Sequence, residues 1–423
     1  MTILIAGGGI AGLTLGLTLH QIGVPFRIFE ATRDIRPLGV GINLQPNAVR
    51  ELFDLGLESQ LDDIAVRTRQ ISFHSKYGLK IWHEPRGLDA GYKWPQYSIH
   101  RGKLQVLLYE TLIARAGVDC VVTGARATGF DTSPEHASLT LENGDTATGD
   151  LVIAADGIHS ALRAQMVPNE GAPIWNGRVL WRATSVAPAF FGGGAMVMIG
   201  HDDLRIVAYP ISDPDPQTGL VTLNWIAEKK FDPAQGWAKE DWNRAANIDD
   251  FLPDFTDWTF NWIDVPALIR AADQVFEYPM VDRLPLERWT HQRVTLMGDA
   301  AHPTYPVGSN GASQAIIDAR VIGAKLLEHG QTPQALNAYE AAVRPVTTGV
   351  FHANRGSGPD AIMQWVEDRC AGKFDNIDDV IAHADLAAHS EKYKSVAGFS
   401  IDALNAQPPL IPPNSLTIDG QVP

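Results

Sequence analysis

Three glycines near the start of the chain have the spacing of a dinucleotide-binding turn. Gly7, Gly9 and Gly12 occupy the glycine positions of a GxGxxG pattern. Without side chains there, the backbone can turn tightly and a pyrophosphate can sit against the N-terminus of the next helix. Glu30 follows about twenty residues on, where a carboxylate can accept hydrogen bonds from ribose hydroxyls. The pattern predicts a bound dinucleotide but does not separate FAD from NAD, and glycines that serve only helix–strand packing are the alternative.

A second acidic residue follows an apolar run late in the chain. Asp299 comes after residues 294–298 (VTLMG) and opens the string DAAHPTYPVGSNG. A carboxylate at the end of a buried strand can hold a polyhydroxylated chain such as ribityl. A helix that opens at Asn310 would point its positive end at a flavin ring and stabilise negative charge near N1 and O2. The string therefore favours a flavin, with a simple Gly-Asp turn as the alternative.

A third string, DGIHSALR, begins at Asp156 after the apolar residues 151–155. An acid followed by Ser160 is equally typical of a helix N-terminus with a capping side chain. Alone, this string does not decide between a binding site and a helix start.

The elements that must position these residues can be predicted from hydrophobic periodicity. Residues 2–6 indicate a strand, 10–22 a helix that ends at Gly23, and 25–30 a second strand, which together form a βαβ unit of a parallel sheet. Residues 104–116 predict a helix that stops at Gly117, and 118–122 a strand. The dipeptide Asn143-Gly144 predicts a hairpin between residues 137–141 and 146–148. Residues 151–155 return as a buried parallel strand.

The middle of the chain has a different texture. Residues 175–289 alternate in the manner of strands and hold eight of the eleven tryptophans, which predicts a separate sheet. A buried strand from about residue 293 and helices after Asn310 and Thr332 return to the first domain. We therefore expect an FAD-binding part at 1–174, with substrate-domain insertions around 65–100. We further expect a substrate-binding sheet at 175–290 and a second FAD-binding part at 291–350. The last part, 351–423, should be a C-terminal helical region with an extended tail.

Composition excludes several classes of function. A net charge of -15 disfavours binding to nucleic acid or anionic lipid. The two cysteines, Cys120 and Cys370, lie far apart, and the histidines lack metal-binding spacing, so we expect neither a disulfide framework nor a metal. No apolar run approaches the length of a membrane span. The strand-like start leaves no room for a signal peptide, and we expect a cytoplasmic enzyme.

Together the three strings resemble the flavoprotein aromatic hydroxylases, the single-component FAD-dependent monooxygenases of the para-hydroxybenzoate hydroxylase type. The resemblance covers nearly the whole chain, and GDAAHPTYPVGSNGASQAIIDAR with YKSVAGFSIDALN is most similar to the phenazine-modifying branch. It implies an α/β fold: a Rossmann-like FAD-binding domain, an interleaved mixed β-sheet substrate domain and C-terminal helices. It further implies bound FAD, transiently bound NADH or NADPH, O2, a small aromatic substrate, and a monomer or homodimer.

The resemblance also implies contacts with FAD, residue by residue. Glu30 and the three glycines match the AMP-half contacts. Arg101 matches the arginine along the diphosphate, with Gln105 assisting, and a solvated arginine at a helix start is the alternative. Asp299 matches the ribityl contact, and Asp156 a motif associated with both FAD and pyridine nucleotide. The other expected cofactor residues are Gly41 and Ile42 beside the isoalloxazine (or an ordinary glycine loop), and Ile10, Ala11, Pro306, Gly308, Gly311 and Ala312.

Candidate substrate residues come from the mid-chain sheet and from the loop after Asp299. From the sheet we nominate Trp181, Arg182, Tyr209 and Trp225, together with Arg205 as a cation facing the flavin; from the loop, Pro303, Tyr305 and Pro306. His302, Pro306 and Arg182 are the candidate catalytic residues, and Arg182 or His302 could bind or deprotonate an acidic substituent. Alternation turns only half of each strand inward, so core packing is the alternative for the substrate residues, and a histidine satisfied by backbone hydrogen bonds is the alternative for His302. No phenol-activating tyrosine pair is evident, which argues against a simple phenol as substrate.

The implied reaction is aromatic hydroxylation. In that family NADH or NADPH reduces FAD, and O2 adds to form a flavin C4a-hydroperoxide that needs a dry pocket. One alternative is a flavin enzyme of other chemistry, such as Baeyer–Villiger oxygenation, N-oxygenation or reduction; a halogenase is disfavoured because the chain lacks WxWxIP. The second alternative is a pyridine-nucleotide dehydrogenase or a non-catalytic nucleotide-binding module.

Overall fold

The computed structural model describes residues 2–235, 245–356 and 358–413. Its first sheet has six strands in the order β20 (Thr290–His291), β21 (Val294–Leu296), β12 (Leu151–Ala154), β1 (Ile3–Ala6), β2 (Phe26–Glu30) and β8 (Val121–Thr123). All neighbours are parallel except β20 and β21. Helix α1 (Ile10–Gln21) joins β1 to β2, which confirms the predicted βαβ unit. Strand β21 pairs with β12, so the late segment does return to the first sheet.

Long helices cover this sheet and bring distant segments together. Helix α1 packs against α4 (Arg101–Ala116) and α7 (Gly311–His329), and α7 packs against α8 (Pro333–Asn354). The approach of α1 to α7 is close, because a Cβ on Gly323 would lie 2.4 Å from the Cγ2 atom of Thr18. A Cβ on Gly298 would lie 3.2 Å from that of Ala11 and 3.5 Å from that of Ala315, so the starts of α1 and α7 both lie near the turn that follows β21.

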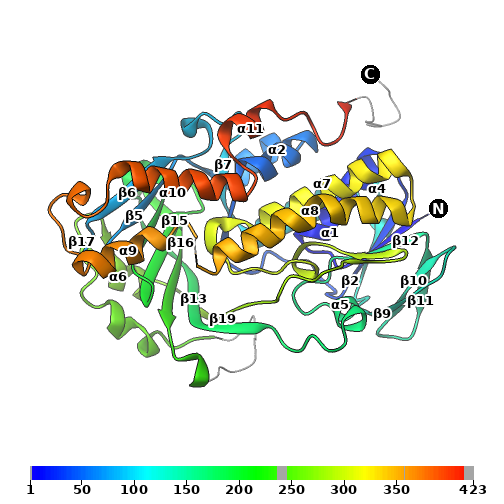
Figure 1. The fold of residues 1–423 in the computed structure, drawn as a ribbon, viewed down its shortest axis with the longest axis horizontal. Coiled ribbons are helices and arrows are strands. Elements are labelled where there is room, and N and C mark those ends of the chain that lie inside the picture. The colour runs from blue at the N-terminus through cyan, green and yellow to red at the C-terminus, as the bar shows by residue number, and fades with distance from the viewer. Residues whose placement is uncertain (1, 236–244, 357, 414–423) are drawn as a thin grey trace.

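The mid-chain region forms a seven-stranded sheet, as predicted, and it includes strands from the expected insertion. The order is β19 (Phe276–Asp282), β13 (Ile174–Pro188), β16 (Leu220–Lys230), β15 (Leu204–Pro210), β14 (Ala195–Gly200), β5 (Gln70–His74) and β6 (Lys80–Pro85). Only β14 and β5 are parallel. The two large sheets occupy opposite halves of the molecule, and helices α9 (Ala361–Cys370) and α10 (His383–Val396) lie over the seven-stranded sheet (Figure 1).

The two faces of the seven-stranded sheet have different neighbours. Trp181, Ala183 and Trp225 point to one face, which packs against the segment that contains Phe251. Since successive side chains of a strand alternate, Arg182 points to the opposite face. The register places Tyr209, Asn224, Ile226, Met196, Met198 and Ile71 on the same face as Arg182. We call this the inner face.

Smaller elements complete the fold. The predicted hairpin around Asn143-Gly144 forms from β10 (Ala137–Leu141) and β11 (Thr146–Gly149), next to β9 (Ala127–Thr132). A second three-stranded sheet consists of β3 (Gly41–Leu44), β7 (Gln96–His100) and β4 (Ala65–Thr68), and β17 (Thr259–Phe260) pairs with β18 (Ile263–Asp264). The remaining α-helices are α2 (Pro46–Asp54), α3 (Glu58–Ile64), α5 (Ala161–Met166), α6 (Val265–Arg270) and α11 (Ile401–Ala406).

The structure departs from the predicted elements in two places. Residues 118–120 form a 3-10 turn instead of the start of a strand, because Gly117 has a positive φ of 87° and turns the chain before β8. Helix α8 runs across the predicted boundary at residue 350, so the domain limits stay a prediction. The tail prediction lies partly outside the described residues, which end at 413. No helix in the described part of the chain is long and apolar enough to cross a bilayer.

Candidate active site

The glycine turn has the geometry that a diphosphate needs. Gly7 has a φ of +104°, and a Cβ there would lie 2.4 Å from the carbonyl oxygen of Ala155; a Cβ on Gly12 would lie 2.0 Å from the carbonyl oxygen of Gly7. At Gly9 a Cβ would meet nothing within 4 Å, so the turn faces open space. Helix α1 begins at Ile10 without a side-chain cap. Its first-turn N–H groups therefore remain available to an anion.

Glu30 and Gln105 both fix the backbone of this turn at Gly8. The Glu30 carboxylate accepts hydrogen bonds from the Gly8 amide at 2.6 Å and the Thr32 amide at 2.7 Å. The Gln105 side-chain amide donates to the Gly8 carbonyl at 2.9 Å. Gln105 thus supports the turn directly, a role that the sequence motif did not specify.

Asp299 faces an internal cleft. Its side chain is accessible to solvent, yet burial within the surrounding protein raises the pKa of its carboxyl, which nearby His302 and Arg101 oppose. Both observations agree if the carboxylate lines a cleft rather than the outer surface. The Arg101 guanidinium also acts on Arg182, whose pKa is lowered first by burial and then by this like charge. Arg101 therefore lies within electrostatic range of both Asp299 and Arg182.

Buried groups hold the turn that carries Asp299. Asp318, on α7, accepts a hydrogen bond from the Gly298 amide at 2.9 Å and contacts His302 Nε2 at 2.6 Å. Burial alone would lower the pKa of His302, but the Asp318 carboxylate outweighs it and the pKa is raised. The His302 ring lies 5.4 Å from that of Trp289 in the interior. His302 therefore fixes this turn, and the structure does not support the predicted catalytic role.

The string DGIHSALR, which begins at Asp156, supports the same turn. Arg163, only 1% exposed, donates to the carbonyls of Ala300 and Ala301, each at 2.9 Å. One carboxylate oxygen of Asp156 accepts from the Ala161 amide at the start of α5, so the string does open a helix, and a role of Asp156 in cofactor binding stays a prediction. Its other oxygen is buried without a partner, and burial raises the pKa of the carboxyl.

The loop at Gly41 is held against the inner face. The Gly41 amide donates to Asn224 Oδ1 at 2.7 Å, and the Gly41 carbonyl accepts from Arg182 at 2.9 Å. A Cβ on Gly41 would lie 2.7 Å from that of Asn224, so only glycine allows this approach. Arg182 Nε is buried without a partner, and burial raises the pKa of neighbouring Tyr209 to about 12. Ile42 follows in β3, so the loop borders the cleft with Arg182.

Two of the predicted substrate residues lie on the wrong face of the sheet. Trp181 stacks on Phe251 with ring centres 4.5 Å apart, and Trp225 donates its indole N–H to Ser185 at 2.9 Å. Both belong to the core opposite the inner face. The prediction that they line the pocket is therefore contradicted, because Trp181 and Arg182 are adjacent on one strand and cannot share a face.

The other nominated residues have separate surroundings. Arg205 is buried between Glu228, at 2.7 Å, and Asp360, so its charge is compensated and it does not act as a free cation toward a flavin as predicted. Tyr305 is 5% exposed and packs with Leu180 against the inner face, and burial raises its pKa to about 12. Pro303 is buried nearby, and Pro306, in the loop before α7, is exposed. Tyr305 is thus a packing residue between sheet and loop.

A narrow cavity separates the inner face from the loop before α7. Its volume is about 20 Å³, so an aromatic ring can enter only when the lining side chains move apart. Its lining consists of Gln45, Ile71, Arg86, Gln96, Met196, Met198, Gly308, Ser309, Pro359, Ser390, Tyr393, Lys394 and Phe399. Only Gly308 among these was predicted. Most of the others come from segments far apart in the sequence, and residues 195–200 (AMVMIG) are apolar throughout, so the sequence did not show which face the methionines occupy.

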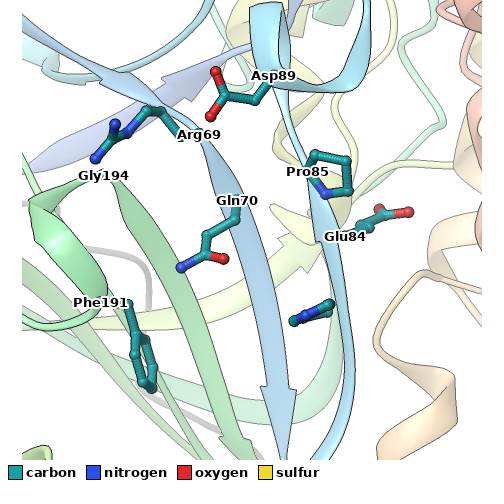
Figure 2. A pocket seen from close by; sticks show the side chains of 8 residues that line it. Arg69, Gln70, Glu84, Pro85, Asp89, Phe191 and Gly194 are labelled. Carbon is teal, nitrogen blue, oxygen red and sulfur yellow. The ribbon is translucent and has the colours of Figure 1, made fainter.

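A larger and more open cavity lies at the outer strands of the same sheet. Figure 2 shows Gln70 and Glu84 on adjacent strands, with Arg69 and Asp89 at one end and Phe191 at the other. Its lining includes none of the predicted site residues. We therefore assign the active site to the narrow cavity and the cleft beside it.

The residues around the cleft fit FAD. Helices α1 and α7 both start without a side-chain cap, and a Cβ on Gly9 or Gly311 would meet nothing within 4 Å. The buried Arg182 Nε is a donor without a partner and the accessible Asp299 carboxylate is an acceptor, and the charge of Arg101 acts on both residues. A long cofactor with a diphosphate and a polyol would meet complementary groups along its length.

A family model described as an FAD binding domain matches residues 1–354. The chain belongs to this family. It is 42% identical to a phenazine 1,6-dicarboxylic acid hydroxylase, PhzS, from Lysobacter antibioticus, and the match covers 84% of this chain and 89% of that protein. It is 31% identical to a 3-amino-4-hydroxybenzoate 2-monooxygenase, PtmB3, from Streptomyces platensis, and this match covers 89% of this chain and 94% of that protein.

Solved structures share the fold. A substrate complex of a salicylate hydroxylase superposes with a TM-score of 0.74 at 20% identity, covering 96% of this chain and 97% of that one. The structure of Klebsiella pneumoniae HpxO with FAD and uric acid superposes with a TM-score of 0.69 at 22% identity, covering 95% of this chain and 93% of that one. The predicted fold class, bound FAD and membership of the flavoprotein aromatic hydroxylases are confirmed. This protein is an FAD-dependent aromatic hydroxylase.

Proposed function

We propose that this enzyme hydroxylates a flat, multi-ring heteroaromatic acid of the phenazine type, with O2 and NADH or NADPH as co-substrates. The narrow cavity carries this proposal, because one wall holds Met196 and Met198 and the opposite side holds Gly308 and Ser309 of the loop before α7. Thioether side chains adapt to the faces of flat rings. The similarity to the phenazine 1,6-dicarboxylic acid hydroxylase supports this substrate class.

When bound, FAD would supply the redox chemistry and the activation of oxygen. The chain's own residues would bind and orient it. The glycine turn and the start of α1 would hold the diphosphate, together with Arg101. Glu30 would take the adenosine ribose, and Asp299 the ribityl chain. Ile10, Ala11 and Ala312 would contribute through their positions at the starts of α1 and α7.

Arg182 and the start of α7 would act near the isoalloxazine. Arg182 is a buried cation with an unpartnered N–H, so it can stabilise negative charge that develops on the ring system. The N-terminus of α7, opening at Gly311, supplies a second positive end. Tyr209 and Tyr305 close the inner face around this region and exclude water.

A substrate panel tests the proposal. Phenazine-1,6-dicarboxylate, 3-amino-4-hydroxybenzoate and salicylate are each added to the FAD-loaded enzyme with NADH or NADPH. Oxygen uptake and peroxide formation are measured, and products are identified by mass. We expect coupled hydroxylation to be fastest with the phenazine acid. Coupled turnover of a single-ring acid alone, or no stimulation by the phenazine acid, would contradict the proposal. A cytoplasmic location and a monomeric or homodimeric state stay predictions.

A further inference from the structure

Two buried cations line one end of the narrow cavity. Arg86 follows β6, and Lys394 lies on α10; they are 7% and 9% exposed. Both contact Glu84, with Arg86 Nη2 at 2.5 Å and Lys394 Nζ at 3.1 Å from its carboxylate oxygens. Glu391 lies 3.7 Å from Lys394 but is 58% exposed, so water screens it. The interior of the cluster therefore holds two positive charges and one negative charge.

The carboxylate of this cluster does not line the cavity. Glu84 is absent from the lining of the narrow cavity; it lines the other, more open cavity (Figure 2) and also accepts a hydrogen bond from Ser390 at 2.6 Å. Both of its oxygens are therefore engaged. The face that Arg86 and Lys394 present to the narrow cavity is positive.

Unpartnered polar atoms point to a ligand at the same place. Arg86 Nε is buried and has no hydrogen-bond partner. The side-chain oxygens of Gln45 and Gln96, also in the lining, are buried without partners. An unpaired buried donor is unfavourable, and more so when it is charged. A carboxylate is an acceptor that would satisfy Arg86 and compensate the excess positive charge.

The remaining walls orient the ligand. Ile71, Met196 and Met198 form an apolar wall on the inner face, and Gly308 and Ser309 lie at the cofactor side. A flat ring against the methionines would place one edge toward the loop before α7. Its acidic substituent would then reach Arg86 and Lys394.

We propose that Arg86, assisted by Lys394, is the subsite that recognises the carboxylate of an aromatic acid substrate. This inference rests on the proposed function, since it concerns the same cavity. It makes the enzyme selective for the acid over an uncharged analogue of the same shape, and it gives α10 a part in substrate recognition.

Binding titrations test the subsite without requiring turnover. Phenazine-1-carboxylate and its primary amide are titrated into the FAD-loaded enzyme, and the change in flavin absorbance gives Kd. The variants are Arg86→Met, Arg86→Lys and Lys394→Met. The control is Lys392→Met, which removes an exposed charge two residues away on α10. FAD content per chain reports on folding.

We expect the wild type to bind the acid at least about tenfold more tightly than the amide, and Arg86→Met to weaken the acid about 10- to 100-fold. The same variant should change the amide by less than about twofold, with partial recovery in Arg86→Lys and no change in Lys392→Met. Equal loss for acid and amide, or a wild type that does not distinguish them, would overturn the subsite. If the acid binds selectively but is not hydroxylated, the proposed function fails and the subsite stands. If acid and amide are hydroxylated equally well and Arg86→Met alters neither, the subsite fails alone.

Discussion

The phenol of Tyr393 occupies the space beside Gly308 so closely that a Cβ on this glycine would lie 1.9 Å from the Tyr393 hydroxyl oxygen. The same hydroxyl accepts a hydrogen bond from Asn310 at 2.6 Å and donates to Asn354 at 2.8 Å. Gly308 and Asn310 belong to the loop before α7, and Tyr393 belongs to α10. Helix α10 is thereby held against the loop before α7.

Gly308→Ala should weaken the packing of Tyr393 against the loop before α7. The residue has a φ of +67°, so the new methyl group adds backbone strain to the overlap with Tyr393. We expect the free energy of unfolding to fall by about 1–3 kcal/mol. Urea unfolding measures the change. Gly356→Ala is the control, since a Cβ there meets nothing within 4 Å. Equal stability of both variants would contradict the close packing of Tyr393 against Gly308.

Asp299→Ala should impair FAD retention. The carboxylate lines the cleft, and its loss would leave the ribityl hydroxyls without an acceptor; a hydrogen bond to a charged group contributes about 1.5–3 kcal/mol, or about 10- to 150-fold in Kd. The ratio of flavin to protein absorbance after gel filtration, and reconstitution of the apoprotein with FAD, measure the effect. A variant that retains FAD like the wild type would exclude Asp299 from the site.

The interaction of His302 with Asp318 should depend on pH. The pKa of His302 is raised in the folded protein, so protonation favours folding. The stabilisation is fully present below the unfolded pKa of about 6.5 and is lost as the pH rises through the folded value. The stability advantage of the wild type over His302→Asn should therefore shrink from pH 6 towards pH 9. Unfolding in urea at each pH provides the measurement, and an advantage that grows with pH would contradict the expected coupling.

Arg182→Met should uncouple the enzyme. Removing a buried cation that holds the Gly41 carbonyl takes away both a positive charge near the cofactor and the support of its loop. We expect a larger share of NADH or NADPH oxidation to end in peroxide, with partial recovery in Arg182→Lys. Oxygen electrode traces with and without catalase separate the two products. Unchanged coupling and substrate affinity would remove Arg182 from the active site.

Trp181→Leu should affect stability and leave substrate affinity unchanged. The indole is 2% exposed in the core opposite the inner face. Its truncation should cost about 2–4 kcal/mol of unfolding free energy. A calorimetric scan gives the loss, and KM for the aromatic substrate gives the comparison. A selective increase in KM would instead place Trp181 in the pocket, as its sequence pattern predicts.

The features that sequence predicts best in this chain are local. The glycine turn, β1, β2 and α1 follow from a contiguous pattern, and residues 294–299 indicate a strand that ends in an acid. The phase of β13 could not be predicted, because Val179, Leu180 and Trp181 are consecutive apolar residues on a strand whose two faces both lie against protein. The sequence therefore could not say whether Trp181 or Arg182 faces the cleft.

Residues that act through distant partners were missed for a different reason. Asp318 lies in the middle of an amphipathic helix and has no local sign of its contact with the Gly298 amide. Lys394 and Glu84 are 310 positions apart, and their contact depends on how α10 crosses the seven-stranded sheet. Such pairs are fixed by tertiary packing alone.

The pairing of β21 with β12 sets the order of events when the protein is made. At about 5–20 residues per second, roughly 15–60 s separate the emergence of Gly12 from that of Asp299. During that interval the nascent chain has a nucleotide turn but lacks the Asp299 carboxylate, and once strand β12 has emerged one of its edges stays open until β21 is made. Loading with FAD is thus a late step of biogenesis, and chains that stall or end before α7 should be colourless and prone to aggregation.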